Sequence, residues 1–416
     1  MIVQGSISFP GDKSISHRAL MIAALSSDTS RIKNLSDGKD VKSTEKCLKQ
    51  CGITINNLPD ETISLKGKTF IDPEDDLDCE NSGTTIRLLT GLLAGQKINA
   101  RLIGDNSLSQ RPMDRIVNPL SKMRLTIKSN SGKLPISIEN SNIRGIDYRS
   151  NISSAQVKSA VLFCGLGAEG VTNYYESVKS RDHTEILLET VGIKLNRDGN
   201  KVTVNRPTKS PTGLNISIPG DPSTAAFFAG AAAIVSGSEL ILNNVLANPT
   251  RFEFFNSLKR MGAGLEFISS WNETGEEVKN IKINYSTLQA IKIDKDQIPG
   301  LIDEIPILSI IATQAVGKTE IRDAKELRVK ESDRIRSIMI NLKNMGASVE
   351  EYDDGFSING PTRLKGARIR TYNDHRIAMA FTIAGLIADG KTELDNAKCV
   401  DISFPGFFKL LESIVK

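Results

Sequence analysis

A short pattern recurs along the chain at nearly regular intervals, and it limits the possible folds more than any other feature. Its copies begin at Leu48, Leu120, Leu188, Leu258 and Leu342, and Leu410 opens a shortened sixth copy. The full copies are 72, 68, 70 and 84 residues apart. Each reads as the end of an apolar helix followed by a strand, and four have a glycine where a helix C-cap needs a left-handed residue. Such a period predicts six α/β units of about 70 residues each.

A second repetition groups these units into two halves. Residues 9–14 (Phe-Pro-Gly-Asp-Lys-Ser) return as residues 218–223 (Ile-Pro-Gly-Asp-Pro-Ser), 209 positions later in a chain of 416 residues. Asp12 and Asp221 are expected to be helix N-caps, and Pro222 suits the first position of a helix. The two stretches therefore predict two crossing points between similar halves. Residues 269–277, which lie in the longest spacing, are predicted to form a peripheral polar loop.

Composition argues against several classes of protein. A net charge of +4 and an aromatic content of 5% are not typical of a nucleic-acid binder. The chain has no apolar stretch of membrane-spanning length and no apolar leader, so we expect neither membrane insertion nor secretion. Five scattered cysteines and three histidines without ligand spacing predict a reduced, cytoplasmic protein with no structural metal and no redox cofactor. This pattern does not exclude a hard cation held by carboxylates.

The stretch from Gly11 to Arg18 combines a predicted helix start with unusual charge. Asp12 can cap the helix, and Lys13 then stands in the first turn, where the helix dipole does not favour a cation. Ser14 and Arg18 are four residues apart and share a face. Because a helix N-terminus also attracts anions, the stretch predicts an anion site. A capped surface helix with solvated charges is the alternative.

Other predicted turns and helix starts are polar in the same way. They are Asn81–Arg87, which resembles an anion cradle; Arg111, which precedes Pro112; Ser153–Gln156, followed closely by Lys158; Ser180–His183, which contains Arg181; and Tyr372–Arg376, which caps a predicted apolar helix over residues 377–388. Ordinary helix caps and surface arginines explain each of these segments equally well when it is taken alone.

Two adjacent carboxylates, Asp303 and Glu304, lie in an otherwise apolar run. Burial raises the pKa of a carboxyl group, so we expect at least one pKa here to be raised, as suits a general base. In the charged run 328–334, Lys330, Glu331 and Arg334 are expected to line one helical face. A solvated ion-pair face is the alternative. Anion sites combined with buried carboxylates favour group transfer by proximity and acid–base catalysis.

Seven of these motifs, in this order along nearly the whole chain, resemble the 5-enolpyruvylshikimate-3-phosphate (EPSP) synthase family. They are Gly11–Arg18, Asn81–Thr84, Arg111-Pro112, Ser154–Gln156, Asp303-Glu304, Arg328–Arg334 and Asn373–Arg376. The resemblance implies transfer of the enolpyruvyl group of phosphoenolpyruvate to the 5-hydroxyl of shikimate-3-phosphate, with release of phosphate, in the shikimate pathway. It implies an α/β fold of two similar domains, residues 1–13 with 220–416 and residues 14–219. Each domain would contain three inverse α/β units, with the active site in the cleft between the domains of a monomer.

The resemblance also implies roles for single residues. Shikimate-3-phosphate would be held by Ser14, Arg18, Ser154, Gln156, Asp303 and Lys330, and phosphoenolpyruvate by Lys13, Gly83, Arg111, Arg334 and Arg376. Asn81, Ser153, Ala155, Arg181 and His375 are further expected substrate contacts. Asp303 would take the hydroxyl proton, and Glu331 and Lys13 would handle proton transfer at the methylene carbon. The reaction would pass through a tetrahedral intermediate.

The chain departs from some family members at Leu88, Glu326 and Ile402, where those members have proline, asparagine and lysine. Among rival functions, UDP-N-acetylglucosamine enolpyruvyl transferases share the architecture but use a loop cysteine, and residues 104–115 contain none. A P-loop nucleotide hydrolase is disfavoured because Asp12 interrupts the required Gly-Lys-Ser order. A non-catalytic repeat scaffold would place similar polar residues on every repeat, whereas here they differ between repeats.

Overall fold

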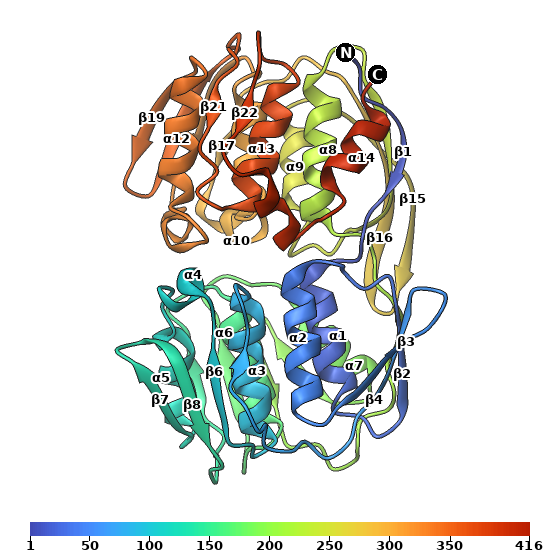
Figure 1. Cartoon of the computed structure of the whole chain (residues 1–416), viewed down its shortest axis with the longest axis vertical. Helices are drawn as coiled ribbons and strands as arrows, with labels where there is room; N and C mark the ends of the chain where they lie inside the picture. The colour runs from blue at the N-terminus through green and yellow to red at the C-terminus, as the bar shows by residue number, and fades with distance from the viewer. The chain divides into compact units, whose positions relative to one another are not determined.

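The computed structural model describes residues 1–416, which form two compact units (Figure 1). Unit 1 contains Met1–Pro10, Pro219–Asn272 and Glu276–Lys416, and unit 2 contains Gly11–Ile218 with Glu273–Gly275. The chain therefore passes from one unit to the other just before Asp12 and again just before Asp221. The domain boundaries predicted from the sequence lie at residues 13 and 220.

Each unit contains three sheets, and the five four-stranded sheets follow one plan. One strand pairs in parallel with the first strand of a β-α-β-β run. The last strand of that run pairs antiparallel with the first, and the middle strand pairs antiparallel with the last. In unit 2 the sheets are β13 (Asn215–Ser217), β2 (Thr29–Lys33), β4 (Thr62–Lys66) and β3 (Thr54–Asn57); β5 (Leu77–Asp78), β6 (Ala100–Ile103), β8 (Lys133–Glu139) and β7 (Thr126–Asn130); and β9 (Asp147–Arg149), β10 (Thr172–Tyr175), β12 (Lys201–Val204) and β11 (Leu195–Asp198).

Unit 1 repeats this plan, and its third sheet is shortened to two strands, as the truncated sixth copy in the sequence predicts. Its sheets are β1 (Gln4–Ser8), β14 (Glu239–Leu246), β16 (Glu276–Asn284) and β15 (Gly264–Glu273); β17 (Lys292–Ile293), β18 (Gly317–Ile321), β20 (Gly355–Gly360) and β19 (Ser348–Tyr352); and β21 (Arg368–Ile369) with β22 (Glu393–Leu394). Six inverse α/β units in two sets of three confirm the predicted fold class.

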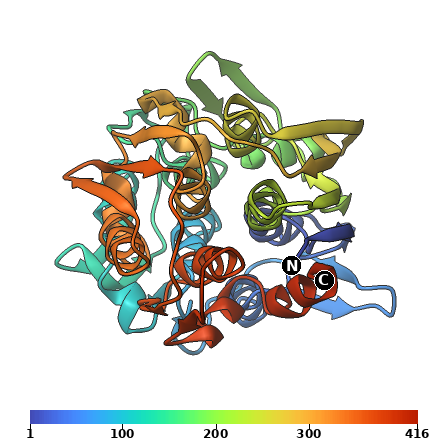
Figure 2. The same cartoon turned by 90° about the horizontal axis from the view of Figure 1, so that it is seen from above.

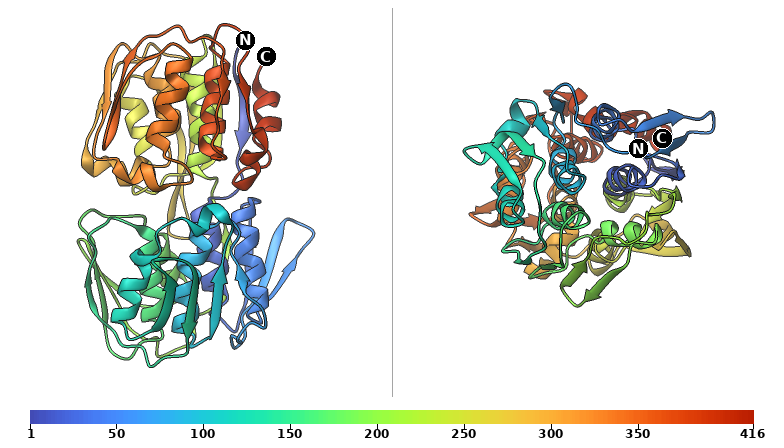
Figure 3. Two further views of the ribbon diagram at one scale, coloured as in Figure 1. Left: turned by 60° about the vertical axis from the view of Figure 1, so that its left-hand side comes forward. Right: turned by 90° about the horizontal axis from the view of Figure 1, so that it is seen from below.

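Three largely buried helices form the centre of each unit, because their sequences are apolar on nearly every side. They are α1 (Lys13–Ala23), α3 (Gly83–Gly95) and α6 (Ala155–Gly165) in unit 2, and α8 (Pro222–Ile234), α11 (Ile305–Ala312) and α13 (His375–Gly385) in unit 1. Viewed along the helices, each unit has its strands on the outside (Figure 2; Figure 3, right).

The remaining helices are shorter or amphipathic. In unit 2 they are α2 (Lys39–Gln50), α4 (Asn106–Ser109), α5 (Asp114–Lys122) and α7 (His183–Thr190). In unit 1 they are α9 (Glu253–Arg260), α10 (Ile298–Leu301), α12 (Arg334–Asn344), α14 (Phe407–Ile414) and the 3-10 helices η1 (Lys295–Gln297), η2 (Lys325–Val329) and η3 (Ala397–Ile402). No helix has both the length and the hydropathy needed to cross a bilayer.

The repeated pattern marks the C-terminal ends of α2, α5, α7, α9 and α12. Gly52, Gly192, Gly262 and Gly346 all have φ between +83° and +89°, which confirms the predicted left-handed C-caps. The copy without a glycine places Arg124 at φ +66°, so this non-glycine residue adopts the same backbone conformation. The backbone at these five positions is therefore set by the turn from helix to strand, and glycine is the usual but not the obligatory solution.

Two local predictions were wrong. Residues 269–277 are not a loop, because strands β15 and β16 continue to a tight turn at Thr274 and Gly275, both with positive φ. Helix α13 begins at His375 and ends at Gly385, whereas the prediction was 377–388. In each case short-range polarity was a poor guide to where backbone hydrogen bonds form.

Candidate active site

Five of the predicted site motifs lie at the N-termini of the buried helices α1, α3, α6, α11 and α13. Asp12 accepts from Ile15 N at 2.7 Å and Asp221 accepts from Ser223 N at 2.8 Å, so both predicted N-caps are confirmed. The other caps are Ser82 on α3, Ser154 on α6 and Asp374 on α13. Each helix thus presents a polar end with N–H groups that can bind an anion.

Helix α1 places Lys13 in its first turn, as the sequence predicts. The Lys13 ammonium lies 2.9 Å from the Asp40 carboxylate in the first turn of α2, and both side chains are mostly buried. One turn later His17 bonds to the Thr44 hydroxyl at 2.7 Å, and burial lowers the pKa of His17 to about 3 against the opposing charge of Asp40. His17 is therefore a neutral group that joins α1 to α2.

Arg18 and Arg181 both reach Ser14. Arg18 donates to the Ser14 carbonyl at 2.9 Å, and Arg181 Nη1 lies 3.2 Å from the Ser14 hydroxyl. Arg18 is only 2% exposed and also donates to Thr184 at 2.7 Å and Ser159 at 2.9 Å. The structure thus brings three predicted substrate residues together. It also shows that Arg18 joins α1, α6 and α7.

The start of α3 gathers two guanidinium groups around a glycine. Arg111 donates to Asn81 Oδ1 at 2.7 Å, and Arg87 donates to Gln156 Oε1 at 2.5 Å. A Cβ added at Gly83 would lie 3.1 Å from Arg111 Nη1 and 3.3 Å from Arg87 Nη1. Arg87 ends the stretch predicted as an anion cradle and had no predicted role of its own; it is four residues after Gly83 and therefore on the same face of the helix.

Helix α6 contributes its first turn and a buried ion cluster beneath it. Ser153 donates to the Val178 carbonyl, Ser154 caps the helix, and Arg18 Nη2 lies 3.5 Å from the Ala155 carbonyl. Gln156 Nε2 donates to the Thr84 hydroxyl at 3.0 Å, which joins α6 to α3. Lys158 lies one turn deeper, and the sequence analysis assigned it no role.

In unit 1 the centre of the site is Arg334, which is 1% exposed and surrounded by carboxylates. Its Nε donates to Asp374 at 2.8 Å, its Nη2 to Glu331 at 2.6 Å and its Nη1 to Asp303 at 3.3 Å. Burial alone would lower the pKa of Arg334, but the three carboxylates raise it above its usual value. Burial alone would raise the pKa of Asp374, and Arg334 outweighs burial and lowers it.

Two further cations approach Asp303. Lys330 Nζ lies 3.9 Å and Arg376 Nε 4.0 Å from Asp303 Oδ1, and Arg376 Nη1 donates to the Asp303 carbonyl at 2.9 Å. Burial lowers the pKa of Lys330, and Asp303 and Glu326 offset this only in part. His375, the first residue of α13, is buried. The expectation of a raised carboxyl pKa at Asp303 or Glu304 stays a prediction.

One prediction about this cluster was wrong. Lys330, Glu331 and Arg334 do not share a helical face, because α12 begins only at Arg334. Asp333 caps that helix by accepting from Arg336 N at 3.0 Å, and Lys330 has an extended backbone after η2. The chain bends at residues 330–332, so that Glu331 bonds to Arg334 while Lys330 and Arg334 both approach Asp303. The prediction that these three residues lie near one another is confirmed, but the helical spacing on which it rested is not present.

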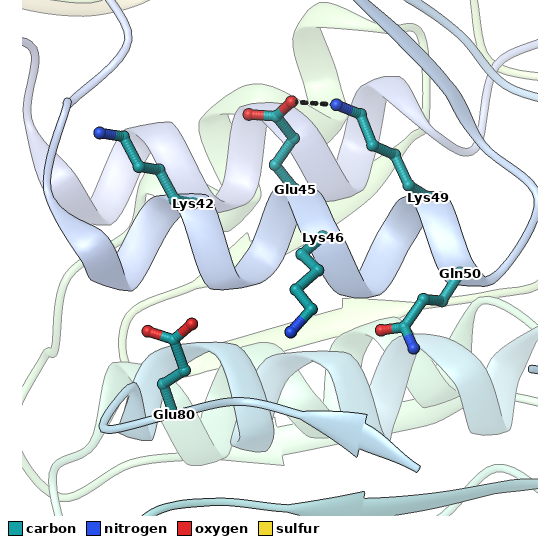
Figure 4. A pocket seen from close by; sticks show the side chains of 6 residues that line it. All are labelled: Lys42, Glu45, Lys46, Lys49, Gln50 and Glu80. Carbon is teal, nitrogen blue, oxygen red and sulfur yellow. Dashed lines mark hydrogen bonds and ion pairs between the residues drawn. The ribbon is translucent and has the colours of Figure 1, made fainter. Parts of the chain in front are cut away.

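A surface groove on α2 is a second candidate for binding (Figure 4). It is lined by Lys42, Glu45, Lys46, Lys49, Gln50 and Glu80. Glu45 and Lys49 form an ion pair at 2.5 Å, and Lys42, Lys46 and Glu80 are exposed to solvent. Because none of the predicted site residues lines it, we do not assign this groove to the reaction.

Comparison with known proteins decides between the families that the geometry allows. The model of one family, EPSP synthase (3-phosphoshikimate 1-carboxyvinyltransferase), matches residues 2–411. The chain belongs to the EPSP synthase family. It is 45% identical over 429 residues to the 3-phosphoshikimate 1-carboxyvinyltransferase of a Sulfurihydrogenibium species, covering 100% of this chain and 98% of that protein. It is 46% identical over 420 residues to that of Thermodesulfovibrio yellowstonii, with the same coverage.

Solved structures agree with this assignment. An EPSP synthase from Acinetobacter baumannii superposes with a TM-score of 0.88 at 38% identity and covers 99% of this chain and 96% of its own. The enolpyruvyl transferase NikO from Streptomyces tendae has a TM-score of 0.79 at 16% identity, with 99% and 95% covered, and shows a shared fold alone. As an EPSP synthase family member the chain is a transferase of the shikimate pathway. It moves the enolpyruvyl group of phosphoenolpyruvate to shikimate-3-phosphate, on the route to aromatic amino acids.

Proposed function

We propose that the residues described above divide the EPSP synthase reaction between two chemical tasks. Unit 2 supplies mainly anion binding, through the helix starts around Lys13, Gly83 and Ser154. Unit 1 supplies mainly proton transfer, through the carboxylates held by Arg334. Both groups of residues act on the same pair of substrates. The proposed reaction uses no nucleophile from the enzyme, so the proximity of the two bound substrates accounts for much of the rate.

The substrate assignments follow the resemblance and are supported by the contacts within each unit. Shikimate-3-phosphate is assigned to Ser14, Arg18, Ser154, Gln156, Asp303 and Lys330, with Ser153, Ala155 and Arg181 beside them. Phosphoenolpyruvate is assigned to Lys13, Gly83, Arg111, Arg334 and Arg376, with Asn81 and His375 beside them. The contact between Ser14 and Arg181 and the contact between Asn81 and Arg111 each join members of one set. Asp303 contacts Arg334 and Arg376 of the other set, as expected where the two substrates react.

The proposed reaction is an addition followed by an elimination. Asp303 takes the proton of the 5-hydroxyl as its oxygen forms a bond to C2 of phosphoenolpyruvate, and Lys13 or Glu331 delivers a proton to C3. The resulting tetrahedral intermediate then loses a proton from C3 and the C2–O bond to phosphate breaks. This re-forms the double bond and releases phosphate. The cations near Asp303 and Gly83 would stabilise the charge that develops on the leaving phosphate.

The observation that carries this proposal is the environment of Asp303. Its carboxylate lies within 4.0 Å of Arg334, Lys330 and Arg376, so three cations hold it in one place. An oriented carboxylate beside a substrate hydroxyl is what a general base requires.

The proposal is tested by phosphate release from phosphoenolpyruvate, with shikimate-3-phosphate or UDP-N-acetylglucosamine as acceptor. We expect release with shikimate-3-phosphate alone. Asp303→Asn should lower kcat by about 10²- to 10⁴-fold, the usual contribution of a general base. Asp296→Asn, at an exposed aspartate of the same unit, is the matched control and should retain wild-type kcat. A kcat for Asp303→Asn within threefold of the control would refute the assignment of the base.

We also propose that the enzyme works as a monomer in the cytoplasm. Each proposed substrate residue belongs to one chain, so a second copy is not needed to complete the site. Light scattering during size-exclusion chromatography should give a mass near 45.3 kDa. A stable dimer would contradict this proposal and would leave the assignment of the reaction unaffected.

A further inference from the structure

Lys158 is a cation buried completely inside unit 2, and the proposed mechanism does not use it. Its Nζ lies 2.9 Å from Glu176 Oε1 and 2.8 Å from Glu185 Oε1, and it donates to the Ser180 carbonyl at 3.2 Å. These contacts occupy all three N–H groups of the ammonium. Ser180 completes the cluster by donating from its hydroxyl to Glu176 Oε2 at 2.6 Å.

Stability alone is a poor explanation for this cluster. It buries two carboxylates with one cation, and well-packed apolar residues often give equal or greater stability than such an ion group. What the cluster does provide is fixed geometry. Lys158 comes from α6, Glu185 from α7, and Glu176 and Ser180 from the segment that joins β10 to α7. A single side chain therefore holds three parts of the chain in one arrangement.

The segment held by Lys158, residues 176–182, has no helix or strand of its own. It carries Arg181, whose Nη1 lies 3.2 Å from the Ser14 hydroxyl. The residue that anchors it is four positions after Ser154, the N-cap of α6. Lys158 thus links the first turn of α6 to the segment that carries Arg181. That turn and Arg181 both contribute residues to the set assigned to shikimate-3-phosphate.

We propose that Lys158 is a positioning residue for shikimate-3-phosphate, which fixes Arg181 and the first turn of α6 at the separation that this substrate requires. This inference rests on the proposed assignment of both elements to that substrate. Lys158 touches no substrate itself and acts through the Ser180 carbonyl, Glu176 and Glu185. A cluster that served only the stability of the core would affect both substrates alike.

The test is a double variant that removes the link and preserves the net charge. Lys158→Met with Glu185→Gln takes away one cation and one anion, and leaves Glu176 bonded to Ser180. We expect the KM for shikimate-3-phosphate to rise about tenfold, because small displacements of binding groups are costly. The KM for phosphoenolpyruvate and kcat should stay within twofold. Lys179→Met, at an exposed lysine of the same segment, is the matched control and should change neither KM.

Two further variants make every outcome informative. Arg181→Met should raise the KM for shikimate-3-phosphate; if it does not, the substrate assignment itself is wrong. If Arg181→Met raises this KM and the double variant does not, or raises both KM values equally, Lys158 is not a positioning residue. Should the double variant fail to fold, Glu176→Gln decides by the same comparison, because it weakens the ion pair between Lys158 and the segment that carries Arg181. It should raise the KM for shikimate-3-phosphate alone by about threefold.

Discussion

Helices α1 and α8 follow similar six-residue stretches and both have an aspartate N-cap, yet different side chains surround their first turns. Asp12 and Asp221 each cap their helix by accepting a backbone N–H at 2.7 and 2.8 Å. In α1 the next residue is Lys13, which is paired with Asp40 and keeps part of its surface exposed. In α8 the next residue is Pro222, which is buried.

The serine that follows shows the same contrast. The Ser14 hydroxyl lies 3.2 Å from Arg181, within the group of residues assigned to substrate. The Ser223 hydroxyl accepts from Arg251 at 2.7 Å and donates to Glu304, and all three residues are buried. The repeat has therefore conserved the capped turn from strand to helix, and neighbouring elements decide whether that turn binds a substrate or supports a carboxylate.

The largest expected difference concerns the cation beside each helix start. Arg251→Met should lower the free energy of unfolding by about 3 kcal/mol or more, because it leaves Asp221 and Glu304 buried with one cation fewer. Lys13→Met should cost less, about 1–2 kcal/mol, because the Lys13 side chain is 19% exposed and only one buried carboxylate, that of Asp40, loses its cation. It should instead abolish most of the activity.

Thermal unfolding and phosphate release, measured on both variants, check this pair of expectations. Similar losses of stability in the two variants would mean that the helix starts do not differ in the way described. Full activity in Lys13→Met would remove this lysine from the proposed site.

The second prediction concerns acid. Burial lowers the pKa of His17 in α1 to about 3, whereas the pKa of an unfolded histidine is about 6.5. Unfolding therefore takes up a proton below pH 6.5, so the stabilisation is present above that pH and is lost as the pH falls toward 3. At pH 5 the loss should be about 2 kcal/mol. Helix α8 contains no titratable side chain.

Hydrogen exchange at pH 7 and pH 5, corrected for its intrinsic pH dependence, measures this difference within one molecule. Protection of α1 should decrease more than protection of α8. In His17→Gln the decrease in α1 should disappear, because glutamine does not titrate. An unchanged decrease in that variant would assign the acid sensitivity to another group.

The third prediction uses the two serines as a matched pair. Ser223→Ala should destabilise unit 1 by about 1–3 kcal/mol, since it removes one hydrogen bond from each of two buried charged groups. Ser14→Ala should leave stability nearly unchanged and raise the KM for shikimate-3-phosphate. Denaturant unfolding and steady-state kinetics of both variants separate the two effects. A raised KM in Ser223→Ala with unchanged stability would reverse the roles proposed for the two helix starts.

The smallest effect is expected at the start of α3. A methyl group at Gly83 would meet the ends of Arg111 and Arg87 at 3.1 and 3.3 Å, and these flexible side chains can move by a few tenths of an ångström. Gly83→Ala should therefore fold normally and raise the KM for phosphoenolpyruvate by about tenfold, the usual effect of one extra carbon in a binding site. An unchanged KM would show that this glycine does not border the substrate.

Several features could be predicted because they depend on neighbouring residues alone. The N-caps at Asp12 and Asp221 follow from a side-chain oxygen two or three residues before a free N–H. The period of the repeat predicted the six units. No role could be predicted for Arg87 or Lys158, because the role of a charged residue in an apolar helix depends on which residues it contacts. For Lys158 these partners are 18 and 27 residues away in the sequence.

The sequence by itself determined the number of α/β units, their caps and the family, because local hydrogen bonding and an ordered set of motifs are both visible along one chain. Only the tertiary structure decided what each polar residue does. It placed Lys330 and Glu331 before a helix rather than on it, and it surrounded Arg334 with three carboxylates. The physical reason is that charge interactions depend on distance in space and on burial, and neither is fixed by distance along the chain.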